Sequence, residues 1–406
     1  MNILPGQLLK KELRSHGRMT MTRIGIVGGQ LQGLEAVYLA RQAGLEAALI
    51  DKDPFVPAAA LADEFYNIDL LDGGKMAECL LNEFDLILPA TENSETLFWL
   101  SHTANRYNVP LALDMHAYGI SSSKLKSNRL FALTGIPIPD RWPECGLPVI
   151  VKPSALSGSI GVEKVNDYAR LNSLLNKAGR ELVVQEYVEG PSYSLEVIGD
   201  RGKCLGLQVT ELNFDAGYDC KRVIAGPNTG REIEDAFLEL GDRIASVIKL
   251  SGIMDIEVIF DGKQLKVLEI DARLPSQTPT AVYHSTGVNM VSLLADYWIQ
   301  GKLPARQELF GVKRAVIFEH LKFSRGTLET AGEHVMAGAP NLKIYKDRFF
   351  ADVLITNLES SSEDWVATVV FTGGTEQQVW EVRDRAINSI IQYFDVKRYI
   401  DPFFNS

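Results

Sequence analysis

Short apolar runs and longer amphipathic stretches alternate along the first part of the chain. Apolar runs at 24–27, 47–50 and 86–89 predict buried strands, and a helical period of apolar positions predicts a helix at 34–42. Strands that alternate with helices favour a parallel sheet, whose ligands bind at the carboxyl ends of the strands. Residues 23–118 are therefore expected to form a Rossmann-like α/β domain.

The pattern changes after residue 118, where hairpins and isolated helices replace the regular alternation. We expect two further units of mixed α+β structure, 119–190 and 191–406, the second with a helix at 290–300 and a strand at 312–320. Residues 1–22 are basic but have no long apolar core, so they are expected to be a mobile extension rather than a signal peptide.

Composition narrows the class of protein. The 406 residues carry 52 acidic and 41 basic side chains, a net charge of −11, which disfavours nucleic acid and anionic membranes as partners. No apolar run has the length of a membrane span. The cysteines are too scattered for a zinc site or a disulfide framework, so a reducing cytoplasm is the expected location. Small molecules are the expected partners, and the sequence leaves a monomer and a homodimer open.

The strongest chemical pattern is an acidic strand near residue 270. Strand alternation places Glu269, Asp271 and Arg273 on one face. The opposite face, which is expected to pack in the core, carries Leu268, Ile270 and Ala272.

A second acidic residue is expected directly across the hairpin. Asp261 and Gly262 supply a turn, and a loop of three or five residues would set Glu257 opposite Glu269, whereas a two-residue loop would not. Two opposed carboxylates repel unless a hard cation such as magnesium lies between them. The alternative is a solvated face with an arginine–carboxylate pair.

Two lysines could meet phosphate groups. Lys152 ends an apolar strand and precedes a loop of small residues, 154–161, whose backbone N–H groups could surround an anion. The loop is not a Walker P-loop, because the lysine precedes the glycines and no helix follows. Lys124 begins a helix that 121–123 can cap. Each lysine could equally be a solvated surface residue.

The stretch 183–190 is an apolar strand that runs into Gln185 and Glu186, groups that could contact the edge of an adenine ring. On the next strand Ser194 and Glu196 share one face, and the carboxylate of Glu196 could hold a substrate ammonium. The alternative is a half-exposed strand with no ligand.

In this order the motifs of residues 120–280 resemble the ATP-grasp ligases, which pair such a fold with an N-terminal Rossmann-like domain. The resemblance implies ATP and Mg²⁺, with two ions expected. It assigns Lys124, Lys152 and the phosphate lid 154–161 with Ser159 to the ATP phosphates. It assigns the adenine contacts to Gln185, Glu186, Tyr187 and Val188. It assigns magnesium to Glu257, Glu269 and Asp271.

The chain departs from that family at two positions. Ser192 stands where many members have a ribose-binding glutamate, and Asp271 stands where an asparagine is frequent. The first difference puts the ribose contact in doubt, and the second adds negative charge to the metal site.

A closer resemblance is to the pyrrolysine-pathway ligases, which join the carboxylate of 3-methyl-D-ornithine to the ε-amine of L-lysine. It is carried by the stretches 27–35, 62–66, 194–197, 252–257 and 269–280. It implies an ornithine site formed by Ser194, Leu195, Glu196, Pro275, Ser276, Gln277, Thr278, Pro279 and Thr280. It implies lysine contacts from Leu31, Gln32, Glu92 and Thr278.

The implied reaction proceeds through an acyl phosphate, which the amine then attacks. Arg273 keeps its proton at any physiological pH, which suits it to stabilise the oxyanion of that attack.

Other functions remain open from the sequence. The turn 28–33 resembles a dinucleotide fingerprint, and an oxidoreductase is the alternative from another class, but Gln30 replaces the glycine that lets the backbone approach a pyrophosphate. Gln30 and Asp51 are the candidate contacts of a second nucleotide at this turn, which could equally hold substrate or nothing. A non-catalytic nucleotide sensor, and an ATP-grasp ligase for another pair of amino acids, are further alternatives.

Overall fold

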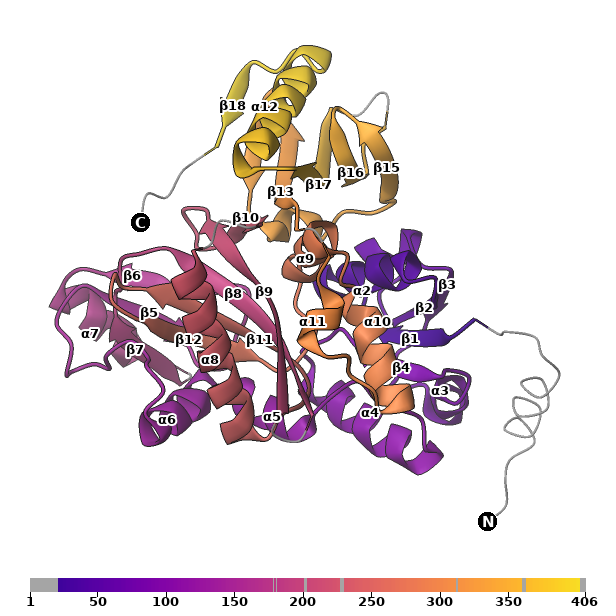
Figure 1. Ribbon diagram of the computed structural model, residues 1–406, viewed down its shortest axis with the longest axis horizontal. Helices are drawn as coiled ribbons and strands as arrows, with labels where there is room; N and C mark the ends of the chain where they lie inside the picture. Colours follow the sequence, from indigo (N-terminus) through magenta and orange to yellow (C-terminus); the bar gives the residue numbers. More distant parts are fainter. Residues whose placement is uncertain are drawn as a thin grey trace.

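The computed structural model describes residues 21–177, 179, 181–200, 203–226, 230–311, 313–359 and 363–401. The predicted extension 1–22 lies outside this part except for its last two residues. In Figure 1 the N-terminal domain and a small three-stranded sheet lie on opposite sides of a large sheet, and a C-terminal lobe projects from one end. No helix among the described residues has the length and apolar character to cross a membrane.

The N-terminal domain confirms the expected α/β pattern. Its parallel sheet has the strand order β3-β2-β1-β4. The strands are β1 (Arg23–Val27), β2 (Glu46–Asp51), β3 (Glu64–Asn67) and β4 (Leu86–Pro89). The helices are α2 (Leu31–Gln42), the 3₁₀ turn η1 (Pro57–Ala60), α3 (Gly74–Leu81) and α4 (Ser94–Tyr107). The inner strands are buried at nearly every position, as strands are when helices cover both faces of a sheet.

Two helices lead into a small antiparallel sheet of strand order β6-β5-β7. The helices are α5 (Met115–Ser121) and α6 (Lys124–Thr134). The sheet contains β5 (Val149–Pro153), β6 (Glu163–Val165) and β7 (Leu182–Glu186), and the helix α7 (Tyr168–Lys177) connects β6 to β7. The side chain of Ser123 caps α6, which is one of the three cap positions that the sequence offers, and Gly135 ends the helix in the left-handed conformation at φ 67°.

The large sheet has the strand order β12-β11-β8-β9-β10-β13-β17-β16-β15. Its first half contains β8 (Ser192–Asp200), β9 (Lys203–Phe214), β10 (Cys220–Ala225), β11 (Ser251–Phe260) and β12 (Leu265–Asp271). The helices of this half are α8 (Arg231–Ile248), α9 (Thr278–Thr286), α10 (Met290–Ala295), the π turn η2 (Asp296–Gln300) and α11 (Arg306–Leu309). The apolar stripe of α8 packs on β8 and β9 through Phe237 and Ile244.

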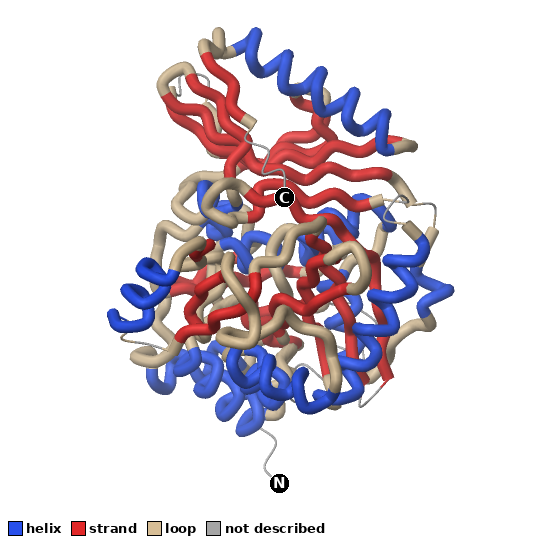
Figure 2. The backbone as a smooth tube through the Cα atoms, turned by 90° about the vertical axis from the view of Figure 1, so that its left-hand side faces the viewer, coloured by secondary structure: helices blue, strands red, loops and turns tan. Residues whose placement is uncertain are grey.

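The C-terminal lobe continues the large sheet, and α12 lies across one face of it (Figure 2). It contains β13 (Ala315–Ser324), β14 (Thr327–Ala331), the 3₁₀ turn η3 (Glu333–Met336), β15 (Lys343–Arg348), β16 (Ala351–Thr356), β17 (Asp364–Gly373), α12 (Glu376–Tyr393) and β18 (Arg398–Ile400). The lobe has a hydrophobic core of its own, in which Phe371 and Trp365 are buried. Residues 315–401 are therefore structurally distinct within the predicted unit 191–406.

Several elements differ from the sequence prediction. The helix expected at 290–300 ends at Ala295 and continues as a wider π turn, and the strand expected from 312 begins at Ala315, with residue 312 outside the described part. The pattern did not predict the short elements α5, α7, β10, β14, β15 and β18. Short edge strands such as β15, with the sequence KIYKDR, carry too many charges to show an apolar alternation.

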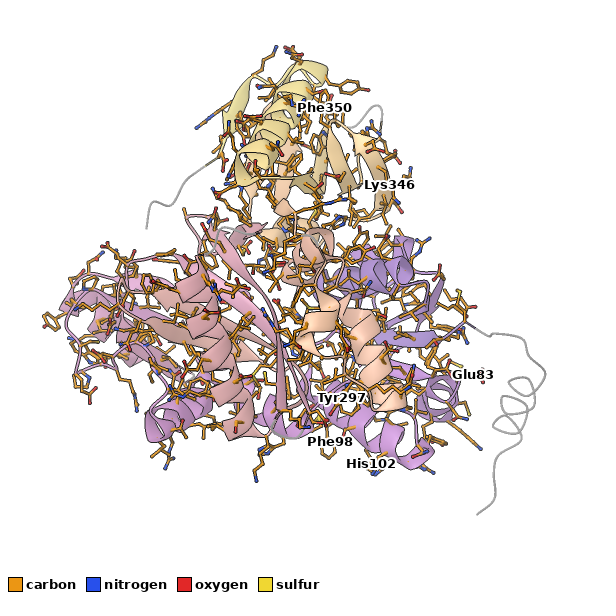
Figure 3. The ribbon with its side chains drawn as sticks, viewed as in Figure 1. Glu83, Phe98, His102, Tyr297, Lys346 and Phe350 are labelled. Atoms are coloured by element: carbon orange, nitrogen blue, oxygen red, sulfur yellow. The ribbon has the colours of Figure 1, made fainter. Side chains whose placement is uncertain are left out.

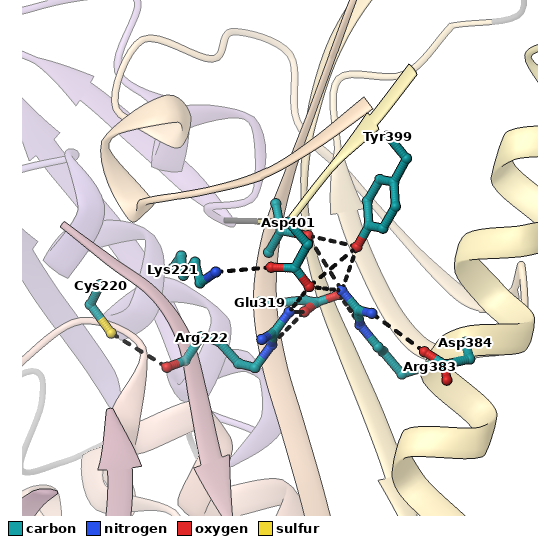
Figure 4. A network of polar contacts seen from close by, with 9 residues as sticks. Cys220, Lys221, Arg222, Glu319, Arg383, Asp384, Tyr399 and Asp401 are labelled. Atoms are coloured by element: carbon teal, nitrogen blue, oxygen red, sulfur yellow. Dashed lines mark hydrogen bonds and ion pairs between the residues drawn. The ribbon is translucent and has the colours of Figure 1, made fainter. Parts of the chain in front are cut away.

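Buried charges join the C-terminal lobe to the large sheet (Figure 4). Asp401 accepts from Lys221 at 2.9 Å, from Arg222 at 2.8 Å and from Arg383 at 2.8 Å. Glu319 lies between the same two arginines, 2.7 Å from Arg222 and 3.0 Å from Arg383. Burial alone would raise the pKa of Asp401, but the charge of Arg222 and the hydrogen bond from Lys221 outweigh it and lower the pKa to about 2.

We predict that Asp401→Asn lowers the free energy of unfolding by about 3 kcal/mol at neutral pH, because it leaves buried cations without their counter-charge. The measurement is urea unfolding at several pH values. The pKa of Asp401 is lowered from 3.8 to about 2 on folding, so the carboxylate stabilises the fold above pH 3.8 and the difference between the proteins disappears as the pH falls toward 2.

Asp384→Asn is the matched control for this prediction. Asp384 contacts the same Arg383 at 3.4 Å, but 65% of its side chain is exposed, so its loss is expected to cost less than about 0.5 kcal/mol. Equal destabilisation by both variants would contradict the role of Asp401.

Candidate active site

A cavity of about 570 Å³ lies between the small sheet and the hairpin of β11 and β12. Its size is typical of a site for a small ligand. The structure brings together in its lining nine residues predicted from the sequence, namely Lys124, Lys152, Ser159, Gln185, Glu186, Tyr187, Val188, Glu257 and Glu269. The apolar part of the wall includes Ile150, Leu212, Ile259 and Leu268.

Glu257 and Glu269 face each other across the hairpin, as predicted. The reason is different from the one expected. The last pair before the turn is Phe260 with Leu265, which leaves a loop of four residues, and an even loop alone would set Glu257 opposite Leu268. A β-bulge between Glu257 and Val258 shifts the register by one residue and restores the pair of carboxylates.

The bulge also changes the environment of Leu268. The sequence placed Leu268 on the packed face with Ile270, but its side chain lines the cavity, while Val267 and Ile270 are both in the core. Strict alternation fails here because the bulge adds a residue to one strand. The carbonyl of Leu268 accepts a hydrogen bond from Lys152 Nζ at 2.9 Å.

The two lysines meet at the acidic end of the cavity. Lys124 Nζ donates to Glu269 Oε1 at 2.7 Å and to the carbonyl of Leu156 at 2.6 Å. Both ammonium groups are buried, and burial lowers the pKa of Lys152 to about 8, although the charge of Glu269 opposes this shift. Lys152 can therefore lose its proton slightly above neutral pH, and an anionic neighbour such as Glu269 favours its charged form.

The electrostatic surroundings of Glu257 suit a residue that binds a metal cation. Burial, and next the charge of Glu269, raise the pKa of Glu257 to about 7. A divalent cation between the two carboxylates would remove this repulsion, and carboxylate oxygens are ligands that magnesium prefers. The third predicted ligand, Asp271, does not converge with them, because its carboxylate is turned to Arg273.

Arg273 joins the hairpin to the N-terminal domain. Its Nε and Nη2 donate to Asp271, its Nη1 donates to Gln32 Oε1 at 3.1 Å and to the carbonyl of Thr91 at 3.0 Å, and its Nη2 also pairs with Glu92 at 3.1 Å. Burial alone would lower the pKa of Arg273, but Asp271 and Glu92 outweigh it and raise the pKa further. The arginine is charged, and its donors are all engaged by these groups.

A second group of acids lies next to the hairpin, on β8 and β11. Ser194 donates to Asp255 and lies 3.3 Å from Glu196, whose Oε2 is buried with no hydrogen-bond partner among the described residues. Burial raises the pKa of Glu196 to about 7 and raises that of Asp255 as well. Leu195 points the other way, into the core beneath α8.

Sequence reasoning missed Asp255. The signal was present, because alternation along β11 puts Asp255 on the face of Glu257. Its register partner on β12 is Asp271, and its partner on β8 is Glu196. Asp255 therefore adds a further carboxylate to the acidic surface.

The predicted ornithine-site segment 275–280 is partly helical, because α9 begins at Thr278. Gln277 precedes it with a left-handed φ of 67°. Oε1 of Gln277 and Oγ1 of Thr278 are buried with no hydrogen-bond partner in the described part of the chain. Pro275 and Pro279 are buried, and Ser276 and Thr280 line a small cavity with Leu31.

The candidates on the N-terminal domain separate into two groups. Gln32 and Glu92 reach the active site through Arg273. Gln30 precedes α2, and Asp51 has both oxygens engaged by the backbone N–H groups of Gly29 and Asp53. Asp51 thus stabilises the turn, the Gln30 side chain does not cap α2, and neither residue is part of the cavity lining.

Comparisons with known proteins agree with this geometry. The ATP-grasp domain family matches residues 121–277. The fold resembles the biotin carboxylase domain of Hydrogenobacter thermophilus 2-oxoglutarate carboxylase, with a TM-score of 0.67, 17% identity and coverage of 93% and 90% of the two chains. It also resembles an L-amino acid ligase of Bacillus licheniformis, with a TM-score of 0.65, 16% identity and coverage of 90% and 97%. Fold, domain match and site together define an ATP-grasp enzyme.

Relatives in sequence are more specific. The 3-methyl-D-ornithine–L-lysine ligase of Methanosarcina barkeri is 34% identical over 375 residues, covering 92% of this chain and 99% of that protein. The ligase of the same name from Methanosarcina acetivorans is 35% identical over 359 residues, covering 88% and 94%. The chain belongs to the 3-methyl-D-ornithine–L-lysine ligase family, and it is an ATP-dependent carboxylate–amine ligase that forms an amide bond.

We predict that ATP binding weakens about tenfold between pH 7.5 and 9.5, because Lys152 loses its proton near pH 8 in the free protein and nearby phosphates favour the protonated form. Arginine stays charged over this range, so Lys152→Arg should flatten the dependence, measured by calorimetric titration with ATP.

Lys126→Arg is the control for the pH experiment, since Lys126 lies on the same helix but is exposed. It should keep the wild-type slope. An unchanged slope in Lys152→Arg would mean that another group titrates.

Proposed function

We propose that this enzyme joins the carboxylate of 3-methyl-D-ornithine to the ε-amine of L-lysine, using ATP and Mg²⁺, in pyrrolysine biosynthesis. The observation that carries the proposal is a cluster of buried and half-buried carboxylates next to a cavity of the size of a nucleotide. Glu196, Asp255 and Glu257 all have raised pKa values caused first by burial. Carboxylates that are shielded from water and have no counter-charge favour the binding of cationic ligands, and both substrates carry extra ammonium groups.

We place the nucleotide in the 570 Å³ cavity in one orientation. Lys124 and Lys152 supply positive charge for the phosphates at the acidic end, and the apolar wall formed by residues such as Ile150 and Leu268 suits an adenine ring. Glu186 is held by Lys266 at 2.7 Å and by the N–H of Asp140 at 2.8 Å, which orients this part of the adenine wall.

Magnesium would be held by Glu257 and Glu269 together with the phosphates of ATP. When bound, it neutralises charge on the phosphoryl group that is transferred. Asp271 is not assigned to magnesium, because it already forms an ion pair with Arg273.

In the first step the ornithine carboxylate attacks the γ-phosphorus of ATP, the bond to the β-phosphate oxygen breaks, and ADP leaves. Glu196 would hold an ammonium of the ornithine derivative, because its carboxylate is buried next to the hydroxyl groups of Ser194 and Thr278 and forms no ion pair among the described residues. The unpartnered Oε1 of Gln277 offers a further acceptor for the same substrate, while the Thr278 hydroxyl interacts with Glu196.

In the second step the lysine ε-amine attacks the acyl phosphate and inorganic phosphate leaves. Glu92 and Gln32 would bind the α-amino acid end of lysine, and in doing so they would release donors of Arg273. A released guanidinium beside the reacting carbonyl can then donate to its oxyanion. Binding of the second substrate would thus prepare the group that stabilises the transition state.

The direct test is to incubate the protein with ATP, magnesium, L-lysine and 3-methyl-D-ornithine and to weigh the product by mass spectrometry. We expect an amide whose mass is the sum of the two amino acids less one water, with one ADP formed per amide. Substitution of D-ornithine measures the contribution of the methyl group. An amide formed from another pair of amino acids, and not from this one, would identify a different ligase.

We also predict that Glu196→Gln raises the KM for the ornithine substrate at least about tenfold, because a buried hydrogen bond between charges is lost. The KM for ATP should stay within twofold of wild type, about the error of such a measurement. The melting temperature should not fall, since the variant removes an uncompensated buried charge.

Glu239→Gln, at an exposed position of α8, is the control for Glu196→Gln and should change neither KM. If Glu196→Gln affects ATP and ornithine equally, Glu196 does not contact the ornithine substrate.

A further inference from the structure

The phosphate lid, residues 154–161, is in contact with three separate parts of the protein. Lys124 Nζ donates to the carbonyl of Leu156 at 2.6 Å, which joins the lid to α6. Ser157 donates to the carboxylate of Glu92 on the N-terminal domain. Ser159 Oγ donates to the carbonyl of Tyr218, at 2.5 Å, in the turn between β9 and β10. The lid in this structure is therefore closed over the cavity.

The turn that meets the lid is rigid. Asp215 Oδ1 accepts from the N–H groups of Gly217 at 2.7 Å and Asp219 at 3.1 Å, and the N–H of Asp215 donates to the carbonyl of Asp219 at 2.9 Å. Tyr218 has a left-handed φ of 64°, which is uncommon for a residue with a side chain and indicates that the surroundings fix it. The turn thus presents the carbonyl of Tyr218 to the lid in one fixed position.

The C-terminal lobe reaches the same point through His334. His334 Nδ1 lies 2.9 Å from Asp219 Oδ2, and the N–H of His334 donates to the same oxygen at 3.2 Å. The other edge of the ring lies against the lid, because a Cβ atom added to Gly158 would be 2.8 Å from His334 Nε2. One imidazole therefore stands between the lid and an acid that orients it.

We propose that His334, oriented by Asp219, is a positioning residue of the C-terminal lobe that holds the phosphate lid closed during the reaction. The nucleotide half of the proposed function underlies this inference, since the lid has to cover a bound phosphate. His334 lies outside the ATP-grasp match, which ends at residue 277. The C-terminal lobe therefore contributes to the active site as well as to stability.

The groups around the imidazole are acidic. They are Asp219 and Asp215 from the turn and Glu333 from its own element, and the lid has no titratable side chain. His320 of β13 also interacts electrostatically with His334, but burial lowers the pKa of His320 to about 4, so it is neutral. The hydrogen bond to Asp219, followed by the charges of these acids, raises the pKa of His334. The ion pair between His334 and Asp219 is present below that pKa and is lost as the pH rises through it. The contact of His334 with the lid should therefore weaken toward alkaline pH.

A closed lid matters because an acyl phosphate is hydrolysed when water reaches it. A loosened lid should therefore release phosphate without forming amide. This gives two readouts, the backbone hydrogen exchange of the lid with bound nucleotide and the ratio of phosphate to amide during turnover.

The test compares wild type, His334→Ala and the control His102→Ala, which changes an exposed histidine on α4 at the edge of the molecule away from the C-terminal lobe (Figure 3). With the non-hydrolysable analogue adenylyl imidodiphosphate and magnesium bound, we expect the amides of 155–161 to exchange about tenfold faster in His334→Ala only. The ratio of phosphate to amide should rise at least about twofold. Unchanged lid exchange in a folded His334→Ala protein would overturn the proposal.

A double-mutant cycle with Gly158→Ala tests the contact itself. The added methyl group meets the imidazole, so Gly158→Ala should open the lid with His334 present and have a smaller effect in His334→Ala. The left-handed φ of 59° at Gly158 strains alanine in both backgrounds and cancels in the cycle. Additive effects on lid exchange would mean that ring and lid do not interact.

Asp219→Asn provides the test if His334→Ala does not fold. It keeps the size of the side chain and removes the charge that orients the imidazole, so it should also loosen the lid. Lid hydrogen exchange at the wild-type rate in this variant would contradict the role proposed for His334. The exchange experiment needs the nucleotide analogue alone. A wrong assignment of the amino-acid substrates would abolish amide formation and leave the difference in lid exchange intact.

Discussion

Repulsion between Glu257 and Glu269 is the interaction on which the rest of the active site depends. The β-bulge sets these half-buried carboxylates opposite each other, where the charge of Glu269 disfavours ionisation of Glu257. Lys124 compensates for part of this charge by its contact with Glu269, and Lys152 binds the carbonyl that the bulge exposes. Both lysines, the lid that Lys124 holds and the cation site therefore follow from one irregularity in one hairpin.

Arg273 extends this arrangement from the hairpin to the N-terminal domain. The same guanidinium contacts Asp271, Glu92 and Gln32, so its position depends on both domains. Glu92 in turn accepts from Ser157 of the lid. A substrate that binds Glu92 would compete with the arginine and with the lid at once. Substrate binding, lid position and the availability of Arg273 are thus physically linked, as a ligase that must protect a reactive intermediate requires.

The sequence was sufficient for the pattern of the N-terminal sheet, the cap of α6 at Ser123 and the pairing of Glu257 with Glu269. The pairing was predicted through a loop of the wrong length, because a bulge leaves no mark in a period-two pattern. Leu268 was assigned to the wrong face for the same reason, and Asp255 was overlooked although alternation placed it beside Glu257. Contacts such as Asp219 with His334 join residues 115 positions apart, and no local period encodes them.

The C-terminal lobe illustrates how distant residues complete a site. Lys221 lines the nucleotide cavity, yet its ammonium is fixed by Asp401 near the end of the chain. Arg222, the next residue, is shared between Asp401 and Glu319, and it is fully buried. Asp219, which directly precedes β10, holds His334 against the lid. The lobe thus contacts the beginning of β10 through several charge pairs, so it cannot move away from the cavity without exposing buried charges. This constraint makes the lobe part of the cavity wall, and it explains why a segment beyond the ATP-grasp match has so many buried ion pairs.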